Sequence, residues 1–112
     1  MLLRKPAVLL LGCSLLAPLG CRQRLTAGEQ QGASLYQTNC SPCHEDTPEG
    51  LLKQPPRLNR LFQKETLPDG VPTSDQAVHD VIVEGLRTMP AFNGRLSEDQ
   101  VQLILHYLHI RN

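Results

Sequence analysis

The segment Cys40-Ser41-Pro42-Cys43-His44 constrains the fold of this chain more than any other feature of its sequence. Two thiols three positions apart can each form a thioether with one of the two vinyl groups on a single porphyrin edge. The histidine that follows then lies under the iron, where its imidazole can act as an axial ligand. The pentad therefore predicts a covalently attached haem that one short segment both binds and ligates.

Three other roles for this pair of cysteines stay open and fit less well. A thioredoxin-like dithiol is set in a βαβ pattern, and no alternating, strand-like run flanks the pentad. A structural zinc site needs four ligands, but the remaining cysteines, Cys13 and Cys21, lie in an N-terminal segment that we expect to be removed. A plain disulfide would leave His44 without a role.

The composition favours a cofactor inside the core. The chain has 112 residues with no Trp, two Phe and two Tyr. Without its leader it keeps about 90 residues, a size at which an ordinary apolar core is small and marginal. We therefore expect a single domain in which a buried porphyrin supplies part of the apolar surface that the helices pack around.

The first 20 residues are predicted to be an export signal. Arg4 and Lys5 form a positively charged start, and the segment from Ala7 to Leu19 is almost wholly apolar. This apolar run is shorter than the roughly 20 residues that a membrane span requires. The chain is therefore expected outside the cytoplasm, on the periplasmic side of a bacterial membrane.

The end of this signal resembles the cleavage point of bacterial lipoprotein signals, in which a small residue precedes a cysteine that becomes diacylated. Gly20-Cys21 fits that description, although Pro18 stands where such signals prefer Leu. Cys13 has a similar local setting but follows a shorter apolar run, and a plain cleaved signal also stays open. We expect a lipid on Cys21, a polar tether over residues 21–31 and a globular domain over residues 32–112.

The charge disfavours a nucleic-acid partner. From Arg22 onward the chain carries nine Lys or Arg and eleven Asp or Glu. Binding to nucleic acid needs a concentrated basic patch, and this part of the chain has a slight acidic excess.

Three helices and no strand are expected. The first runs from about Glu29 to Thr38 and leads into the pentad. The proline-rich stretch from Glu45 to Pro72 is expected to be loop, with at most one short helix near residues 58–64. The last helix begins at Ser97, with Gln100 at capping-box spacing; its apolar stripe consists of Val101, Ile104, Leu105 and Leu108.

The second helix is expected to begin after Thr73-Ser74, because Thr73 and Gln76 also have capping-box spacing. It is expected to end at Gly85. Its apolar side consists of Ala77, Val78, Val81 and Ile82.

The order of these elements resembles the class I cytochrome c family over residues 29–112. A helix, C-x-x-C-H, a proline-rich loop, a helix ending in glycine, the segment Met89-Pro90-Ala91-Phe92 and a closing helix follow one another. The resemblance implies an all-α fold of three main helices around one haem c. It implies a monohaem carrier that passes single electrons between redox protein partners, with no catalytic residues and no small-molecule substrate. A haem-based gas-binding or sensor module with a displaceable sixth ligand is the alternative.

The resemblance also implies roles for single residues. His44 would be the proximal axial ligand and Met89 the distal one; apart from the initiator, Met89 is the only methionine. In Pro56-Arg57-Leu58 the Pro56 carbonyl would accept the Nδ1 hydrogen of His44, although Pro55 stands where the family commonly has Gly. The first and last helices would cross at small and aromatic residues, namely Gly32, Tyr36 and Tyr107.

The other histidines, His79, His106 and His109, fall on polar helix faces and are expected to be solvated. Haem propionates would have Arg57, Arg60 and Arg95 as candidate partners, and the sequence does not choose among them.

Overall fold

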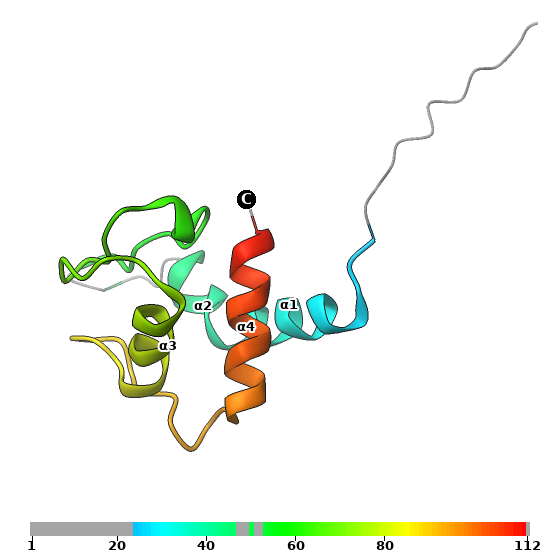
Figure 1. Cartoon of the computed structure of the whole chain (residues 1–112). Helices are drawn as coiled ribbons and strands as arrows, with labels where there is room; N and C mark the ends of the chain where they lie inside the picture. Colours follow the sequence, from blue (N-terminus) through cyan, green and yellow to red (C-terminus); the bar gives the residue numbers. More distant parts are fainter. Residues whose placement is uncertain (1–23, 47–49, 51–52, 112) are drawn as a thin grey trace, which may run out of the picture.

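The computed structural model describes residues 24–46, 50 and 53–111, and the regular secondary structure within them is helical. The predicted signal and Cys21 lie outside these residues. The elements are α1 (Ala27–Asn39), α2 (Ser41–His44), the 3₁₀ helix η1 (Leu61–Gln63), α3 (Asp75–Glu84) and α4 (Glu98–Ile110) (Figure 1). Only isolated β-bridges occur in the described part of the chain. The all-α fold class predicted from the sequence is confirmed.

The helices α1 and α4 cross at close range (Figure 1). A Cβ built on Gly32 of α1 would lie 2.3 Å from the carbonyl oxygen of Leu103 and 2.9 Å from Cβ of Tyr107, both in α4. Beside this contact the rings of Tyr36 and Tyr107 pack with their centroids 5.4 Å apart. The predicted crossing at these residues is therefore confirmed, and glycine is what allows the two backbones to approach.

Capping boxes begin both of these helices. In α4 the Ser97 hydroxyl accepts from the Gln100 N–H, and the Gln100 side chain accepts from the Ser97 N–H, as predicted. In α1 the same exchange links Thr26 and Glu29, so the helix begins at Ala27. Residues 27–31, which the sequence analysis assigns to the tether, are therefore helical.

The predicted start of α3 after Thr73-Ser74 is confirmed, but the predicted capping residue is wrong. Ser74 is the N-cap, and its hydroxyl accepts from the Ala77 N–H at 3.1 Å; no Thr73–Gln76 capping box forms. Thr73 belongs instead to the preceding loop, where its own N–H donates to the Glu65 carbonyl at 3.0 Å. Its hydroxyl is buried without a hydrogen-bond partner in the described structure. The helix ends at Gly85, as predicted.

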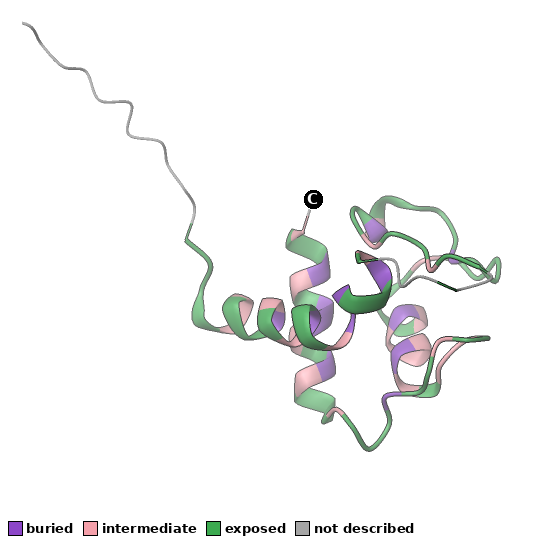
Figure 2. Ribbon diagram, turned by 180° about the vertical axis from the view of Figure 1, so that it is seen from behind, coloured by how far each residue is buried: buried purple, intermediate pink, exposed green. Residues whose placement is uncertain are grey.

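The core is built from the end of α1, from the inner faces of α3 and α4, and from the loops before and after α3. The whole predicted stripe of α4 is buried, as are Val78 and Ile82 of α3. Figure 2 shows these buried positions lining the sides of the helices that face one another. Leu61 of η1 and Leu67 complete this layer from the loop. Among the described residues, no helix combines the length and apolar character needed to cross a membrane.

Candidate functional site

The C-x-x-C-H pentad itself forms a turn of helix, which the sequence analysis did not anticipate. The end of α1 passes into α2 at Cys40, and the N–H of His44 donates to the Cys40 carbonyl at 3.0 Å. Pro42 is tolerated because it lies in the first turn, where a backbone N–H has no intrahelical acceptor. Cys40 is 9% exposed and belongs to the core, whereas Cys43 is at the surface.

A hydrogen bond to the loop that follows α2 fixes the ring of His44. Its Nδ1 lies 2.7 Å from the carbonyl oxygen of Pro56, and the residue is 9% exposed. A carbonyl oxygen can only accept, so Nδ1 carries the hydrogen and, in the neutral imidazole, Nε2 keeps its lone pair for another partner. Of the two adjacent prolines it is Pro56, not Pro55, that makes this contact.

Met89 lies in a tight loop directly after α3. The N–H of Met89 donates to the Leu86 carbonyl at 2.9 Å, and the Leu86 N–H donates back to the Met89 carbonyl at 3.2 Å. Two residues of this loop have positive φ: Gly85 at 79° and Arg87 at 54°. A Cβ on Gly85 would meet the Met89 carbonyl oxygen at 2.6 Å, so both the backbone angle and the close approach require glycine there.

The loop is anchored on the carboxyl end of α3. The N–H groups of Phe92 and Asn93 donate to the carbonyls of Ile82 and Val83, at 2.9 Å and 3.1 Å. These carbonyls lie in the last turn of the helix, where no intrahelical donor reaches them. The side chain of Met89 packs, partly buried, against the same core cluster that includes Cys40.

The residues brought together here fit a haem. A single turn of helix supplies two thiols and an imidazole whose Nε2 has no hydrogen-bond partner among the described residues, and a thioether from a different part of the chain borders the same core. The core cluster that contains Cys40 is aliphatic and aromatic, as an apolar macrocycle requires; Leu61 belongs to it, and Leu58, Phe62 and Leu96 pack against it. Neutral nitrogen and thioether ligands are typical of haem iron in electron carriers.

A polar network surrounds the residue that follows the pentad, and the sequence analysis missed it. The carboxylate of Glu45 accepts from the hydroxyl of Tyr36 at 3.3 Å and from the hydroxyl of Ser41 at 3.1 Å, and forms an ion pair with Arg111. The guanidinium of Arg111 also lies over the Tyr36 ring, 4.4 Å from its centroid. These contacts join α1, α2 and the end of α4. Because Glu45 and Arg111 are 66 positions apart, no local sequence pattern predicts that they form an ion pair.

Each of the three remaining histidines lies near a carboxylate, and two of them are solvated as predicted. His106 and His109 of α4 are exposed, but they approach Glu29 of α1 at 3.7 Å and Asp75 of α3 at 2.7 Å. His79 is wrongly predicted to be a solvated surface residue. Its side chain is only 20% exposed, because the polar side of α3 faces the start of α4.

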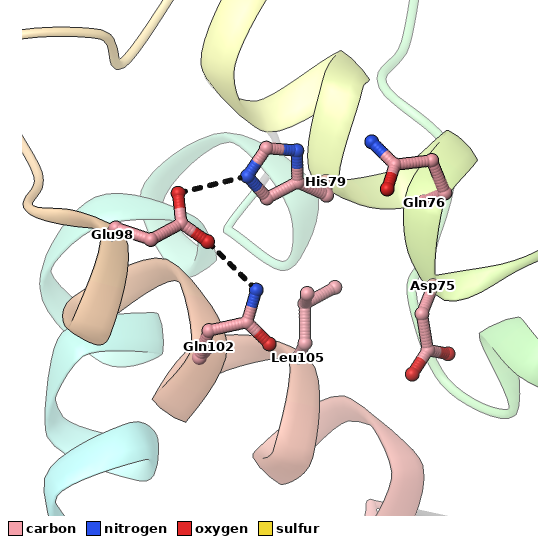
Figure 3. Close-up of a pocket in the computed structure, with 6 residues that line it drawn as sticks. All are labelled: Asp75, Gln76, His79, Glu98, Gln102 and Leu105. Atoms are coloured by element: carbon pink, nitrogen blue, oxygen red, sulfur yellow. Dashed lines mark hydrogen bonds and ion pairs between the residues drawn. The ribbon is translucent and has the colours of Figure 1, made fainter.

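A pocket of about 460 Å³ lies between α3 and α4 around His79 (Figure 3). The ring of His79 hydrogen-bonds Glu98 at 3.0 Å and Asp80 at 3.1 Å, and these two bonds raise the pKa of the imidazole. Glu98 also accepts from the Gln102 amide at 2.8 Å. The pocket is lined by Asp75, Gln76, His79, Glu98, Gln102 and Leu105, so none of the predicted site residues contributes to it.

Of the three candidate arginines for propionate binding, Arg57 and Arg60 are exposed on the loop that carries Pro56. Arg95 is also exposed and lies 4.9 Å from the centroid of the Phe92 ring. In residues 24–46, 50 and 53–111, no three His, Cys, Asp or Glu side chains are grouped so that they could hold a metal ion.

Comparisons with known proteins agree on one family. The family model described as "Cytochrome C oxidase, cbb3-type, subunit III" matches residues 27–108. A cytochrome c6 from Microcystis aeruginosa is 30% identical over 77 residues, which are 69% of this chain and 89% of the relative. A cytochrome c6 from a Nostoc species is 26% identical over 102 residues, or 91% of this chain and 87% of the relative.

The fold agrees with a solved structure. Cytochrome c6 from the diatom Phaeodactylum tricornutum superposes with a TM-score of 0.53 at 23% identity, covering 71% of this chain and 88% of that chain. At this identity the likeness concerns the fold alone, which is that of a small all-α cytochrome.

Proposed function

The chain belongs to the cytochrome c family that the cbb3-type subunit III model describes, and from that premise we propose how its residues hold the haem. Members of this family carry a covalently bound haem c and pass single electrons between redox protein partners. The relatives named cytochrome c6 favour electron transfer over the gas-binding alternative. The proposal concerns attachment by Cys40 and Cys43 and axial ligation by His44 and Met89.

The observation that carries this proposal is the orientation of His44. Its Nδ1 hydrogen is committed to the Pro56 carbonyl, so Nε2 is the nitrogen available to iron. A hydrogen bond of this kind fixes the tautomer and raises the basicity of a ligating imidazole. Pro56 is therefore proposed to position the proximal ligand without touching the metal.

The surroundings of Met89 support its assignment as the second axial ligand. Its loop is fixed by hydrogen bonds to α3, and its side chain borders the core that contains Cys40. A thioether is a neutral, soft ligand, and the His/Met pair raises the reduction potential in cytochromes c. When bound, haem supplies a one-electron Fe(III)/Fe(II) couple. The protein contributes ligands, an apolar surrounding and, at the exposed Cys43, a route to the surface.

Attachment is tested by replacing the two cysteines. Haem should stay with the wild-type polypeptide through denaturation and acid extraction, because thioether bonds survive both. The Cys40→Ala/Cys43→Ala double variant should release all of its haem, and each single variant should keep one thioether. Free extraction of haem from the wild-type chain would contradict the proposal.

The distal ligand is tested with two replacements of Met89. Met89→Leu keeps an apolar side chain of similar size but removes the sulfur, so the ferrous protein should bind carbon monoxide rapidly. Met89→His should stay six-coordinate and have a lower reduction potential, because imidazole donates more strongly to ferric iron than a thioether does. Rapid carbon monoxide binding by the ferrous wild-type protein would rule out Met89 as a stable ligand.

For the location we propose export, with a diacylated Cys21 that holds the domain at the periplasmic face of a membrane. Residues 21–26 would lead from this anchor into α1, and the cytochrome domain would begin with α1 at Ala27. Two acyl chains give stable anchoring, whereas one chain is marginal. The short polar stretch and the slight net charge support hydrophobic over electrostatic attachment.

Fractionation and mass spectrometry test this location. Wild-type protein should remain with the membrane through a high-salt wash, and its mature N-terminus should carry a lipid on Cys21. Cys21→Ser should abolish lipid attachment and leave the leader uncut. A foreign cleavable signal in place of residues 1–20, combined with Cys21→Ser, should give soluble holoprotein with an unchanged spectrum. An unmodified wild-type N-terminus downstream of Cys21 would refute the anchor and leave the haem assignment intact.

A further inference from the structure

The ion pair between Glu45 and Arg111 lies largely out of water. The two side chains are 24% and 21% exposed, and Ser41, which donates to the same carboxylate, is completely buried. Nη1 of Arg111 is buried and has no hydrogen-bond partner in the described part of the chain. In such surroundings solvent screens either charge only weakly, so each charge is balanced mainly by the other.

This pair also lies next to the attachment turn. Glu45 directly follows His44, and the ring under the Arg111 guanidinium belongs to Tyr36, whose carbonyl accepts from the Cys40 N–H at 2.8 Å. The Arg111 guanidinium is therefore linked to the attachment turn through one residue, Tyr36, and its charge acts on the turn over this short distance.

We propose that Glu45 and Arg111 form a charge-neutral pair in which each charge cancels the effect of the other on the reduction potential of the haem, an inference that rests on the attachment through Cys40 and Cys43 proposed above. The oxidised iron carries one more positive charge than the reduced iron. An unbalanced cation near the attachment turn disfavours the oxidised state and raises the potential, whereas an unbalanced carboxylate lowers it. Neither residue touches the iron, and both act through the field and through the position of the turn.

A double-mutant cycle on the purified holoprotein tests the proposal by potentiometric titration of the haem absorbance. Glu45→Gln leaves Arg111 unbalanced and should raise the potential. Arg111→Gln leaves the carboxylate unbalanced and should lower it, and the variant with both changes should return toward wild type. Because partly buried charges are screened weakly, the opposite shifts should persist in ~1 M salt.

Two further variants separate charge from packing. Arg111→Lys keeps the positive charge but loses the planar group over Tyr36, so it should be less stable and yet keep a potential close to wild type. Asp99→Asn removes an exposed charge from the first turn of α4 and should leave the potential unchanged. If Arg111→Gln fails to fold, Glu45→Gln and Arg111→Lys still decide between a shifted and an unchanged potential.

The failures of the two proposals are distinguishable. Wild-type protein without covalently attached haem would contradict the proposed function. Holoproteins with attached haem in which Glu45→Gln and Arg111→Gln shift the potential in the same direction, or leave it unchanged, would overturn the role of the pair alone.

Discussion

Replacing Gly32 by alanine should destabilise the protein although it adds only one methyl group. The new Cβ would lie 2.3 Å from the Leu103 carbonyl oxygen and 3.1 Å from the Leu103 carbonyl carbon, both backbone atoms of α4. A backbone carbonyl cannot rotate away as the end of a flexible side chain can. To reach ordinary contact distance, α1 and α4 must therefore separate by about 1 Å at their crossing, in a core packed as densely as a crystal.

The expected loss of stability in Gly32→Ala is the difference between two opposing effects. Forcing an extra carbon into a packed interior costs about 1–3 kcal/mol, and contact with a rigid backbone places this site at the upper end. Alanine is a better helix former than glycine and returns up to about 1 kcal/mol. The expected net loss is about 2 kcal/mol in the free energy of unfolding, which for a domain of this size lowers Tm by about 8–16 °C.

Gly28 provides the matched control, because it lies in the same helix and faces the same residue. Its Cβ would lie 3.7 Å from Cδ2 of Leu103, an ordinary contact with the end of a side chain. In thermal unfolding of the ferric holoproteins, Gly28→Ala should match wild type or exceed it slightly, and Gly32→Ala should unfold earlier. Equal stability of the two variants, within about 0.5 kcal/mol, would refute the argument from close approach.

Three further predictions concern α3 and its neighbours. Ser74→Ala should cost about 1 kcal/mol of stability through loss of the N-cap, whereas Thr73→Val should cost nothing because it removes a buried hydroxyl without a partner. Chemical denaturation measures both free energies of unfolding, and a larger loss for Thr73→Val than for Ser74→Ala would identify Thr73 as the cap. Gly85→Ala should displace the Met89 loop and speed carbon monoxide binding to the ferrous protein, because alanine is strained at a φ of 79°; an unchanged rate would contradict this. Glu98 raises the pKa of His79 above its ordinary 6.5. Wild type should therefore be more stable than His79→Gln below pH ~6, where the imidazole is protonated, and this difference should be lost as pH rises through the folded pKa. It should also be lost at the low pH at which the Glu98 carboxylate takes up a proton. An advantage that grows with pH would show that the imidazolium is not what stabilises the fold.

The elements that the sequence predicts well are those specified by neighbouring residues. In α4 a capping box begins the helix, and an apolar residue recurs every three or four positions along one face, so both its start and its buried stripe were predictable. Gly85 ends α3 for an equally local reason, since the backbone there needs a positive φ. Such signals act over one or two helical turns and require no knowledge of the rest of the fold.

The start of α3 shows where local signals become ambiguous. Thr73 and Ser74 are adjacent hydroxyl residues, and each has an N–H three positions ahead that its side chain could accept from. The choice is made by the Glu65 carbonyl, which takes the Thr73 N–H and holds that residue in the loop. Because this contact joins residues that no pattern connects, the sequence predicts the helix and its start but not which of the two hydroxyls caps it.

The proposed haem site likewise contains residues that local sequence specifies and residues that only the fold brings together. Cys40, Cys43 and His44 are close in space because they are close in the sequence, so their chemistry can be inferred from the five residues of the pentad. The pairing of Glu45 with Arg111 depends on α1 and α4 crossing at Gly32, because the crossing determines where the end of α4 arrives. A change at the crossing should therefore alter the charge balance beside the attachment turn. Gly32→Ala should shift the reduction potential as well as Tm, and Gly28→Ala should shift neither.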